Sequence, residues 1–238
     1  DLLNPDYRYY NYEFERYWAF YSAWGRMSYN PDTPEEILEL EYESRFGKEA
    51  GKAMMDGLHL ASKVLPRIVA ASYPYGHFPT TRGWAEMQRQ FDLPAYAKAE
   101  GSDIQQFMNM NDYADLLIKD SVTPKRTPLQ NSQWFSNTAE EILALVGKAE
   151  ESIGNRKENE FISTVTDLKI LAHLAEYHSQ RLLAGVHFNR RNSMVACYQY
   201  NLVSGRRHLL FGYRNSELCQ CGCRAWCSTT SMAAPTTR

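Results

Sequence analysis

The sequence YRYYNYEFERYWAFYSAWGRMSYNPD, residues 7–32, is the most aromatic part of the chain, with Tyr, Phe or Trp at eleven of the positions 7–29. Side chains spaced by three and four residues share one face of an α-helix. Five rings have that spacing: Tyr10, Phe14, Tyr17, Tyr21 and Trp24. Trp18 and Phe20 lie off this face, so the helix is apolar nearly all round and must be covered on several sides. We therefore expect a central helix in which Trp18 and Trp24 are largely buried.

Helical patterns continue after this stretch. Thr33-Pro34-Glu35-Glu36 predicts a helix start in which Thr33 caps the first turn and Glu36 completes a capping box. Gly47 predicts the end of that helix as a left-handed cap, and Leu40 is expected on its apolar side. A second helix is expected over residues 48–71, with a kink at Pro66.

Further helices are expected over residues 84–91, 102–119, 132–153 and 158–188, and Ser102-Asp103 is expected to cap the one that begins there. The last two carry the longest apolar faces: Phe135, Ile142, Leu145, Val146 and Ala149, then Phe161, Val165, Leu168, Leu171, Ala172, Ala175, Leu182 and Val186. No alternating strand pattern occurs in residues 1–188. The expected fold class is all-α, an antiparallel helical bundle with an irregular C-terminal tail.

The composition changes after residue 188. Residues 1–188 carry 19 Lys and Arg against 27 Asp and Glu, a net charge of −8, whereas residues 189–238 carry seven Arg and one Glu, a net charge of +6. All five cysteines lie in this last part, which has no helical stripe. We expect a helical domain over residues 1–188 and an irregular basic tail over residues 189–238, which is either a small metal or disulfide module or sequence translated in a shifted frame.

The whole-chain composition excludes several classes of function. The net charge of −2 offers no general attraction for nucleic acid or an anionic membrane. No apolar run approaches the roughly 20 residues that span a bilayer, and the first residues do not form a signal peptide. The chain begins Asp1-Leu2-Leu3 without Met, so we expect a fragment that starts inside a longer protein.

Candidate metal ligands are weak. Cys219, Cys221, Cys223 and Cys227 lie within nine residues, whereas structural zinc sites place their ligands on two separate knuckles. An incidental or oxidised cluster is therefore favoured over a metal site. His173 and His178 are five residues apart and lie on different helix faces, which excludes a zinc-protease motif. We expect Tyr177, His178 and Arg181 to make polar contacts at the helix edge.

Catalytic residues are not predicted. Glu13 and Glu15 are two residues apart on a helix, so they point about 200° away from each other and cannot flank a sugar as a glycosidase pair does. Either Glu13 with Arg16 or Glu15 with Arg16 is expected to help satisfy charge around the aromatic helix. No Gly-rich phosphate loop and no nucleophile motif is present, and no cofactor is expected.

The aromatic loop at residues 72–84 is the candidate binding surface. It mixes flat rings with hydrogen-bond donors, a combination that stacks on a sugar face and binds its hydroxyl groups. The possible carbohydrate contacts are Tyr73, Tyr75, His77, Phe78, Arg82 and Trp84. The alternative interpretation is that these rings only hold the loop against the bundle. This structural role is favoured over carbohydrate contact.

Four segments carry a resemblance to known proteins: FERYWAFYSAWGRMSYNPDTPEEI (14–37), ESRFG (43–47), LHLASKVLPRIVAASYPYGHFPTTRGWAEMQRQ (58–90) and STVTDLKILAHLAEYHSQRLLAGVHFN (163–189). Together they resemble the C-terminal part of large bacterial glycoside-hydrolase-like proteins with the general plan of α-glucuronidases. The resemblance covers residues 1–189 and ends where Arg190-Arg191 begins the unlike tail.

This resemblance implies that a catalytic (β/α)8 barrel precedes the helical region and holds the catalytic carboxylates, so none is assigned to this chain. It also implies carbohydrate processing by a protein exported to the periplasm or the extracellular space. We therefore expect an accessory helical region that packs on an upstream catalytic domain of the same parent chain. A helical protein–protein interaction module unrelated to carbohydrate remains the alternative.

Overall fold

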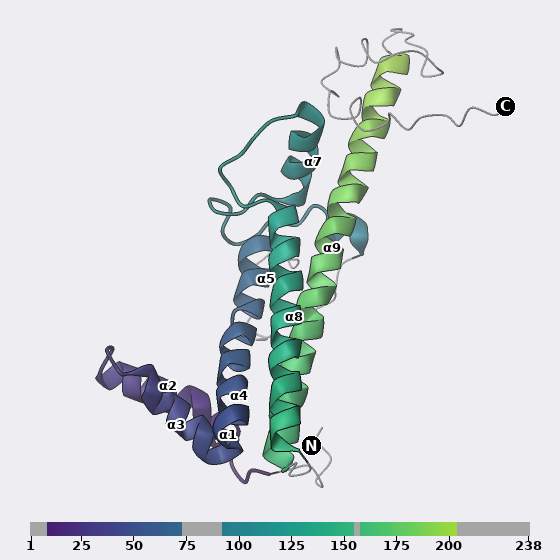
Figure 1. Cartoon of the computed structure of the whole chain (residues 1–238). Coiled ribbons are helices and arrows are strands. Elements are labelled where there is room, and N and C mark those ends of the chain that lie inside the picture. The colour runs from purple at the N-terminus through teal and green to yellow at the C-terminus, as the bar shows by residue number, and fades with distance from the viewer. Residues whose placement is uncertain (1–8, 73–91, 155–157, 204–238) are drawn as a thin grey trace, which may run out of the picture. The chain divides into compact units, whose positions relative to one another are not determined.

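The protein is an all-α helical bundle, as expected (Figure 1). The computed structural model describes residues 9–72, 92–154 and 158–203, and within these ranges the regular elements are helices, with one isolated bridge between Phe107 and Arg126. The bounds are α1 (Glu13–Arg16), α2 (Trp18–Tyr29), α3 (Glu35–Phe46), α4 (Lys48–Ala61), α5 (Val64–Ser72), α6 (Leu93–Tyr96), α7 (Met110–Lys119), α8 (Pro128–Ile153) and α9 (Asn159–Val203).

The chain divides into two compact units. One comprises Asp1–Val64 and Phe135–Tyr177, and the other comprises Leu65–Trp134 and His178–Arg238. The helices α8 and α9 contribute residues to both units. The boundary expected between residues 188 and 189 stays a prediction.

The core of the first unit consists of the apolar stripes of α4, α8 and α9. The side chains that these stripes bury include Met54, Phe135, Ile142, Val146, Phe161, Val165, Leu168 and Ala172. The helices approach closely where Gly57 of α4 faces Leu168 of α9, since a Cβ atom on Gly57 would lie 3.4 Å from Leu168 Cδ1. These stripes agree with the apolar positions that the 3.6-residue period predicts.

The helices α3 and α4 form a tight corner at Gly47, which has a φ of 83° and ends α3 at the predicted residue. Immediately beyond the corner, Gly51 of α4 lies against the backbone of Tyr42 in α3. A Cβ atom on Gly51 would lie 2.6 Å from the carbonyl carbon of Tyr42. Only glycine allows the two backbones to approach this closely.

The prediction of a central aromatic helix is wrong. Tyr17 interrupts the helix with φ −100° and ψ 26°, and none of the residues of α1 or α2 is buried. Trp24 is 62% exposed and Trp18 is only half-buried. The two helices lie at the edge of the unit, where Ser22 and Arg26 bond to Glu41 of α3 (Figure 1). The sequence pattern shows that α1 and α2 carry apolar side chains nearly all round. It does not show that other helices of the same unit bury them.

Several predicted helix starts are also displaced. The Thr33 hydroxyl donates to the Asn30 carbonyl oxygen (2.6 Å) instead of capping α3, and Leu40 is 62% exposed. The helix expected from residue 102 begins only at Met110, because Asn109 caps it through the Asp112 N–H (2.8 Å). At α7, Asn109 makes the capping hydrogen bond that sequence reasoning gave to Ser102 and Asp103, whereas α3 has Pro34 as its N-cap and no side-chain cap.

The break between α4 and α5 falls at residues 62–63, four residues before Pro66. A proline ring clashes with the carbonyl group four positions earlier, which here belongs to Ser62. The expected kink is therefore present, but it lies upstream of the proline. Pro66 itself sits in the first turn of α5, where it is tolerated.

The second unit buries polar groups together with its apolar core. Tyr96 has no exposed surface, and its phenol donates to the Ser72 hydroxyl (3.5 Å). The hydroxyl groups of Ser132 and Ser179 lie 3.0 Å apart. The buried residues of this unit include Ile68, Tyr96, Phe107, Met110, Ala114, Leu182 and Val186. Hydrogen bonds thus compensate part of the cost of burying these polar groups.

The helix α9 continues to Val203, so the predicted helix end at Phe188 is wrong. Asn189 is buried and its amide donates to the Ala97 carbonyl oxygen (2.6 Å). Ser193 donates to Asp115 (3.4 Å). Polar contacts extend the helix after its apolar stripe has ended. The remainder of the predicted tail, including the four clustered cysteines, lies outside the described residues, and so does the helix expected over residues 84–91.

The two helical glycines Gly51 and Gly25 make a matched pair of substitutions. We expect Gly51→Ala to lower the free energy of unfolding by about 1–3 kcal/mol, because the methyl group would meet the Tyr42 backbone. Gly25→Ala should raise it by about 0.5–1 kcal/mol, since no atom lies within 4 Å of the added carbon and alanine favours the helix. Urea unfolding followed by circular dichroism measures both, and equal effects would contradict the close approach of α3 and α4.

Candidate functional site

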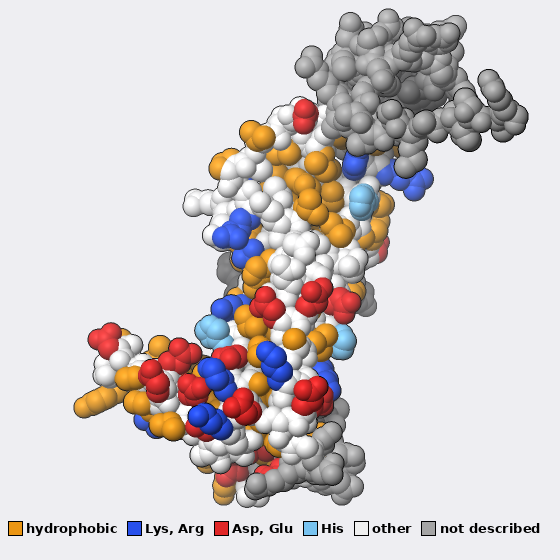
Figure 2. All heavy atoms as spheres, in the orientation of Figure 1, with side chains coloured by type: hydrophobic (Ala, Val, Ile, Leu, Met, Phe, Trp, Pro, Cys, Tyr) orange, Lys and Arg blue, Asp and Glu red, His pale blue; other side chains and the backbone are white. Residues whose placement is uncertain are grey.

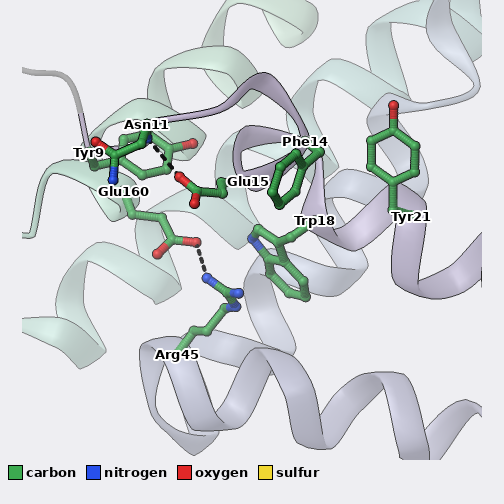
Figure 3. Close-up of a pocket in the computed structure, with 8 residues that line it drawn as sticks. All are labelled: Tyr9, Asn11, Phe14, Glu15, Trp18, Tyr21, Arg45 and Glu160. Atoms are coloured by element: carbon green, nitrogen blue, oxygen red, sulfur yellow. Dashed lines mark hydrogen bonds and ion pairs between the residues drawn. The ribbon is translucent and has the colours of Figure 1, made fainter.

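A pocket of about 600 Å³ lies in the first unit, between the residues before α1 and the helices α1, α2, α3 and α9 (Figure 3). Small-molecule sites in proteins commonly have volumes of roughly 300–1,000 Å³. The lining combines four aromatic rings with two carboxylates, one guanidinium and one amide: Tyr9, Asn11, Phe14, Glu15, Trp18, Tyr21, Arg45 and Glu160.

Trp18 forms the rigid part of the lining. The Arg45 guanidinium lies over its indole ring at 4.1 Å from the centroid, and the ring of Tyr42 lies 4.8 Å away. An arginine over an aromatic face gains electrostatic attraction in addition to packing. The two contacts hold the indole in place although the helix that carries it is exposed.

The polar side of the pocket is an ion pair. Arg45 Nη1 of α3 lies 2.9 Å from Glu160 Oε1 of α9, as the dashed line in Figure 3 marks. The Arg45 side chain is 40% exposed and the Glu160 side chain 20%. The pair therefore reaches solvent in the pocket, and its remaining donor and acceptor positions are open to a ligand.

Glu15 has a structural role. Its Oε2 accepts hydrogen bonds from the backbone N–H groups of Asn11 (2.7 Å) and Tyr12 (3.3 Å) at the start of α1. The expectation that it balances Arg16 is therefore wrong. The guanidinium of Arg16 instead pairs with Asp167 of α9 (3.3 Å).

The remaining rings differ in exposure. Phe14 is 58% exposed and Tyr21 is 50% exposed. Burial raises the pKa of the Tyr9 phenol, and the negative charge of Glu160 raises it further. Tyr9 therefore remains a neutral hydrogen-bond donor at physiological pH, while Phe14 and Tyr21 present ring surface to solvent.

In chemical terms the pocket can bind and orient a ligand. Both carboxylates already accept hydrogen bonds from protein donors, Glu15 from two backbone N–H groups and Glu160 from Arg45. A glycosidase needs an acid and a base or nucleophile that face each other across the scissile bond. Flat rings beside charged groups are instead suited to stacking and hydrogen bonding.

Sequence reasoning did not find this pocket. The ion pair joins residues 115 positions apart, and no local pattern relates them. The aromatic content of residues 7–32 is the local feature of the sequence that belongs to this pocket. It predicts a buried central helix and not a pocket. The six loop residues proposed as carbohydrate contacts, from Tyr73 to Trp84, lie outside the described residues, so they stay a prediction.

The histidines of α9 have different surroundings. His173 is exposed, and its Nδ1 lies 3.5 Å from Glu176 Oε2. His178 is only 1% exposed, so the expected position at the helix edge is wrong for this residue. Tyr177 is 41% exposed, and Arg181 lies 4.0 Å from the centroid of the Tyr96 ring. In the described ranges no cluster of three or more His, Cys, Asp or Glu side chains could hold a metal ion.

Two further observations concern membrane-spanning helices and similarity to known proteins. None of the helices in the described part of the chain combines the length and apolarity that crossing a membrane requires. No protein family model matches the chain, and no curated protein or solved structure is detectably similar to it.

Tyr42, which supports Trp18, provides a pH test of this site. Burial raises its pKa from 10.0 to about 12, with a smaller contribution from the charge of Glu41. Between these two pH values the unfolded chain loses the phenol proton while the folded chain keeps it. The free energy of unfolding should therefore fall as the pH rises from 10 to 12, with a contribution from Tyr42 of up to about 2–3 kcal/mol.

The matched variant for this test is Tyr42→Phe, which keeps the ring against Trp18 and removes the titrating group. Urea unfolding across this pH range should show a smaller slope for the variant than for the parent protein. Identical slopes would show that Tyr42 is not buried as described.

Proposed function

We propose that the chain is an accessory, non-catalytic carbohydrate-binding helical region of a larger glycoside-hydrolase-like protein. The observation that carries this proposal is the pocket that the exposed rings of Phe14 and Tyr21 line together with Trp18 and the Arg45–Glu160 ion pair. Aromatic rings stack on the C–H faces of sugars, and charged side chains bind the hydroxyl groups. The resemblance of residues 1–189 to the C-terminal part of such proteins supports the same proposal.

The role is binding because the pocket carboxylates already have protein partners. Catalysis in the parent is assigned to an upstream barrel, on which this helical region packs. The export of the parent to the periplasm or the extracellular space is a further part of the proposal, and it rests on the resemblance alone.

Substitutions in the pocket test the binding proposal. Isothermal titration calorimetry against a panel of neutral and acidic oligosaccharides should find a ligand, and Phe14→Ala and Tyr21→Ala should each weaken its binding about tenfold through loss of stacking. Trp24→Ala is the control, since Trp24 is equally exposed on α2 and does not line the pocket. Binding that all three substitutions weaken equally would contradict a defined site.

A second measurement concerns the absence of catalysis. The purified chain should hydrolyse none of a panel of aryl glycosides, because both carboxylates of the described pocket, Glu15 and Glu160, are held by protein donors. Turnover that persists after repeated purification, and that Glu160→Gln abolishes, would contradict the accessory role.

The second candidate function is a helical protein–protein interaction module unrelated to carbohydrate. It is favoured by the large apolar side chains that α2 exposes, namely Phe20, Trp24, Met27 and Tyr29. In Figure 2 hydrophobic side chains lie over α2 and α3 among acidic and basic ones, and exposed apolar side chains ringed by polar ones mark interaction surfaces. If this function holds, Trp24→Ala affects the protein's interactions while Phe14→Ala does not, which is the reverse of the result expected for the carbohydrate site.

A further inference from the structure

Arg67 of α5 is a half-buried cation that pairs with no acidic side chain among the described residues. Its guanidinium lies between two aromatic rings, 4.7 Å from the centroid of Phe107 and 4.8 Å from that of Trp134. Burial and, to a lesser extent, the positive charge of Arg126 lower its pKa. A half-buried cation without a counter-charge is costly, so the site favours an anion.

Asn131 holds this guanidinium in position. Its Oδ1 accepts hydrogen bonds from Arg67 Nε (3.2 Å) and Nη2 (2.8 Å). The residue is 1% exposed, and its Nδ2 has no hydrogen-bond partner among the described residues. Because Nδ2 and Oδ1 belong to one amide, this unused donor lies beside the guanidinium. Buried donors without a partner are rare in folded proteins, and an acceptor from a ligand would remove the cost.

A second cation stands close to the first. The backbone of Arg126 bonds to the residues on either side of Phe107, through Arg126 N to Gln106 O (2.8 Å) and Met108 N to Arg126 O (3.0 Å). This pairing places Arg126 next to the ring that covers Arg67. Its side chain is exposed and forms no ion pair with the described residues, so it is available to an incoming anion.

The start of α8 adds to the positive potential. Asn131 lies in the first turn of this 26-residue helix, whose dipole is positive at that end. Thr127 and Gln130 form a reciprocal capping box, in which the Gln130 N–H donates to Thr127 Oγ1 (3.2 Å) and the Thr127 N–H to Gln130 Oε1 (2.9 Å). The helix therefore contributes mainly its dipole, and the side chains supply the donors.

We propose that Arg67, Arg126 and Asn131 form a binding site for a tetrahedral oxyanion, such as a phosphate or sulfate group, at the start of α8. Arg67 lies on α5 and Arg126 in the segment before α8, and an anion with oxygens in several directions can bond to guanidinium groups from both. The site lies in the second unit and does not depend on the carbohydrate proposal. Its ligand is a free oxyanion or a phosphate or sulfate group on a larger molecule.

The test is a titration of the full chain with inorganic phosphate and with sulfate at constant ionic strength. We expect a saturable rise in melting temperature with either ion, because a ligand that binds only the folded state stabilises it. In NMR spectra the Asn131 side-chain amide and the Arg67 Nε–H signals should shift with the same saturation curve. Acetate at the same concentrations should bind more weakly, and equal binding of acetate would overturn the tetrahedral assignment.

Three variants complete the test. Arg67→Gln and Arg126→Gln should each weaken phosphate binding by about tenfold or more, since each removes charge-assisted hydrogen bonds. Arg45→Gln is the matched control, because that arginine also stacks on an aromatic ring but has a carboxylate partner in the other unit. If Arg67→Gln fails to fold, the exposed Arg126 decides alone. Absence of saturable binding, or equal affinity in Arg126→Gln and the parent protein, would overturn the proposal.

Discussion

The buried apolar stripe of α9 is the constraint on which both compact units depend. In the first unit it contributes Phe161, Val165, Leu168 and Ala172, and in the second it contributes Leu182 and Val186. The stripe includes the small residues Ala172 and Ala175 beside larger ones, and small residues allow neighbouring elements to approach closely. Gly185 illustrates this in the second unit, where an added Cβ atom would lie 3.6 Å from the Ala97 Cα atom. Each unit packs its shorter helices against its own part of α9.

Stacking of an arginine side chain on an aromatic ring occurs repeatedly in this protein. Arg45 lies over Trp18, Arg181 over Tyr96, and Arg67 between Phe107 and Trp134. Stacking of this kind fixes a flexible side chain and keeps its charge close to apolar surface. Arg45 has the carboxylate of Glu160 as partner, whereas the partner of Arg67 among the described residues is the uncharged amide of Asn131. That difference separates a pocket suited to neutral polar ligands from a site suited to an anion.

The exposed aromatic helices α1 and α2 show where the prediction from sequence failed. Burial of every ring of α2 would have required cover on all sides, but among the described residues its unit covers it with the face of α3 on which Trp18 meets Tyr42 and Arg45. Most core positions of α8 and α9 were predicted correctly, with Leu145 and Leu171 only half-buried, because each helix buries one face against another helix and the repeat itself identifies that face. A helix that is apolar all round carries no such indication, so Trp24 remained exposed while Trp18 became part of a pocket.

The sequence by itself determined the helical class and most of the buried positions, because helix formation and its 3.6-residue period depend on neighbouring residues. Only the tertiary structure decided which polar groups meet. Arg45 and Glu160 are 115 residues apart, and Arg67 and Asn131 are 64 apart, so their pairing depends on how the helices pack. The same is true of α9 beyond Phe188, where Asn189 finds its partner at Ala97, 92 residues away. Long-range pairing of this kind leaves no trace in local spacing, and it creates both proposed binding sites.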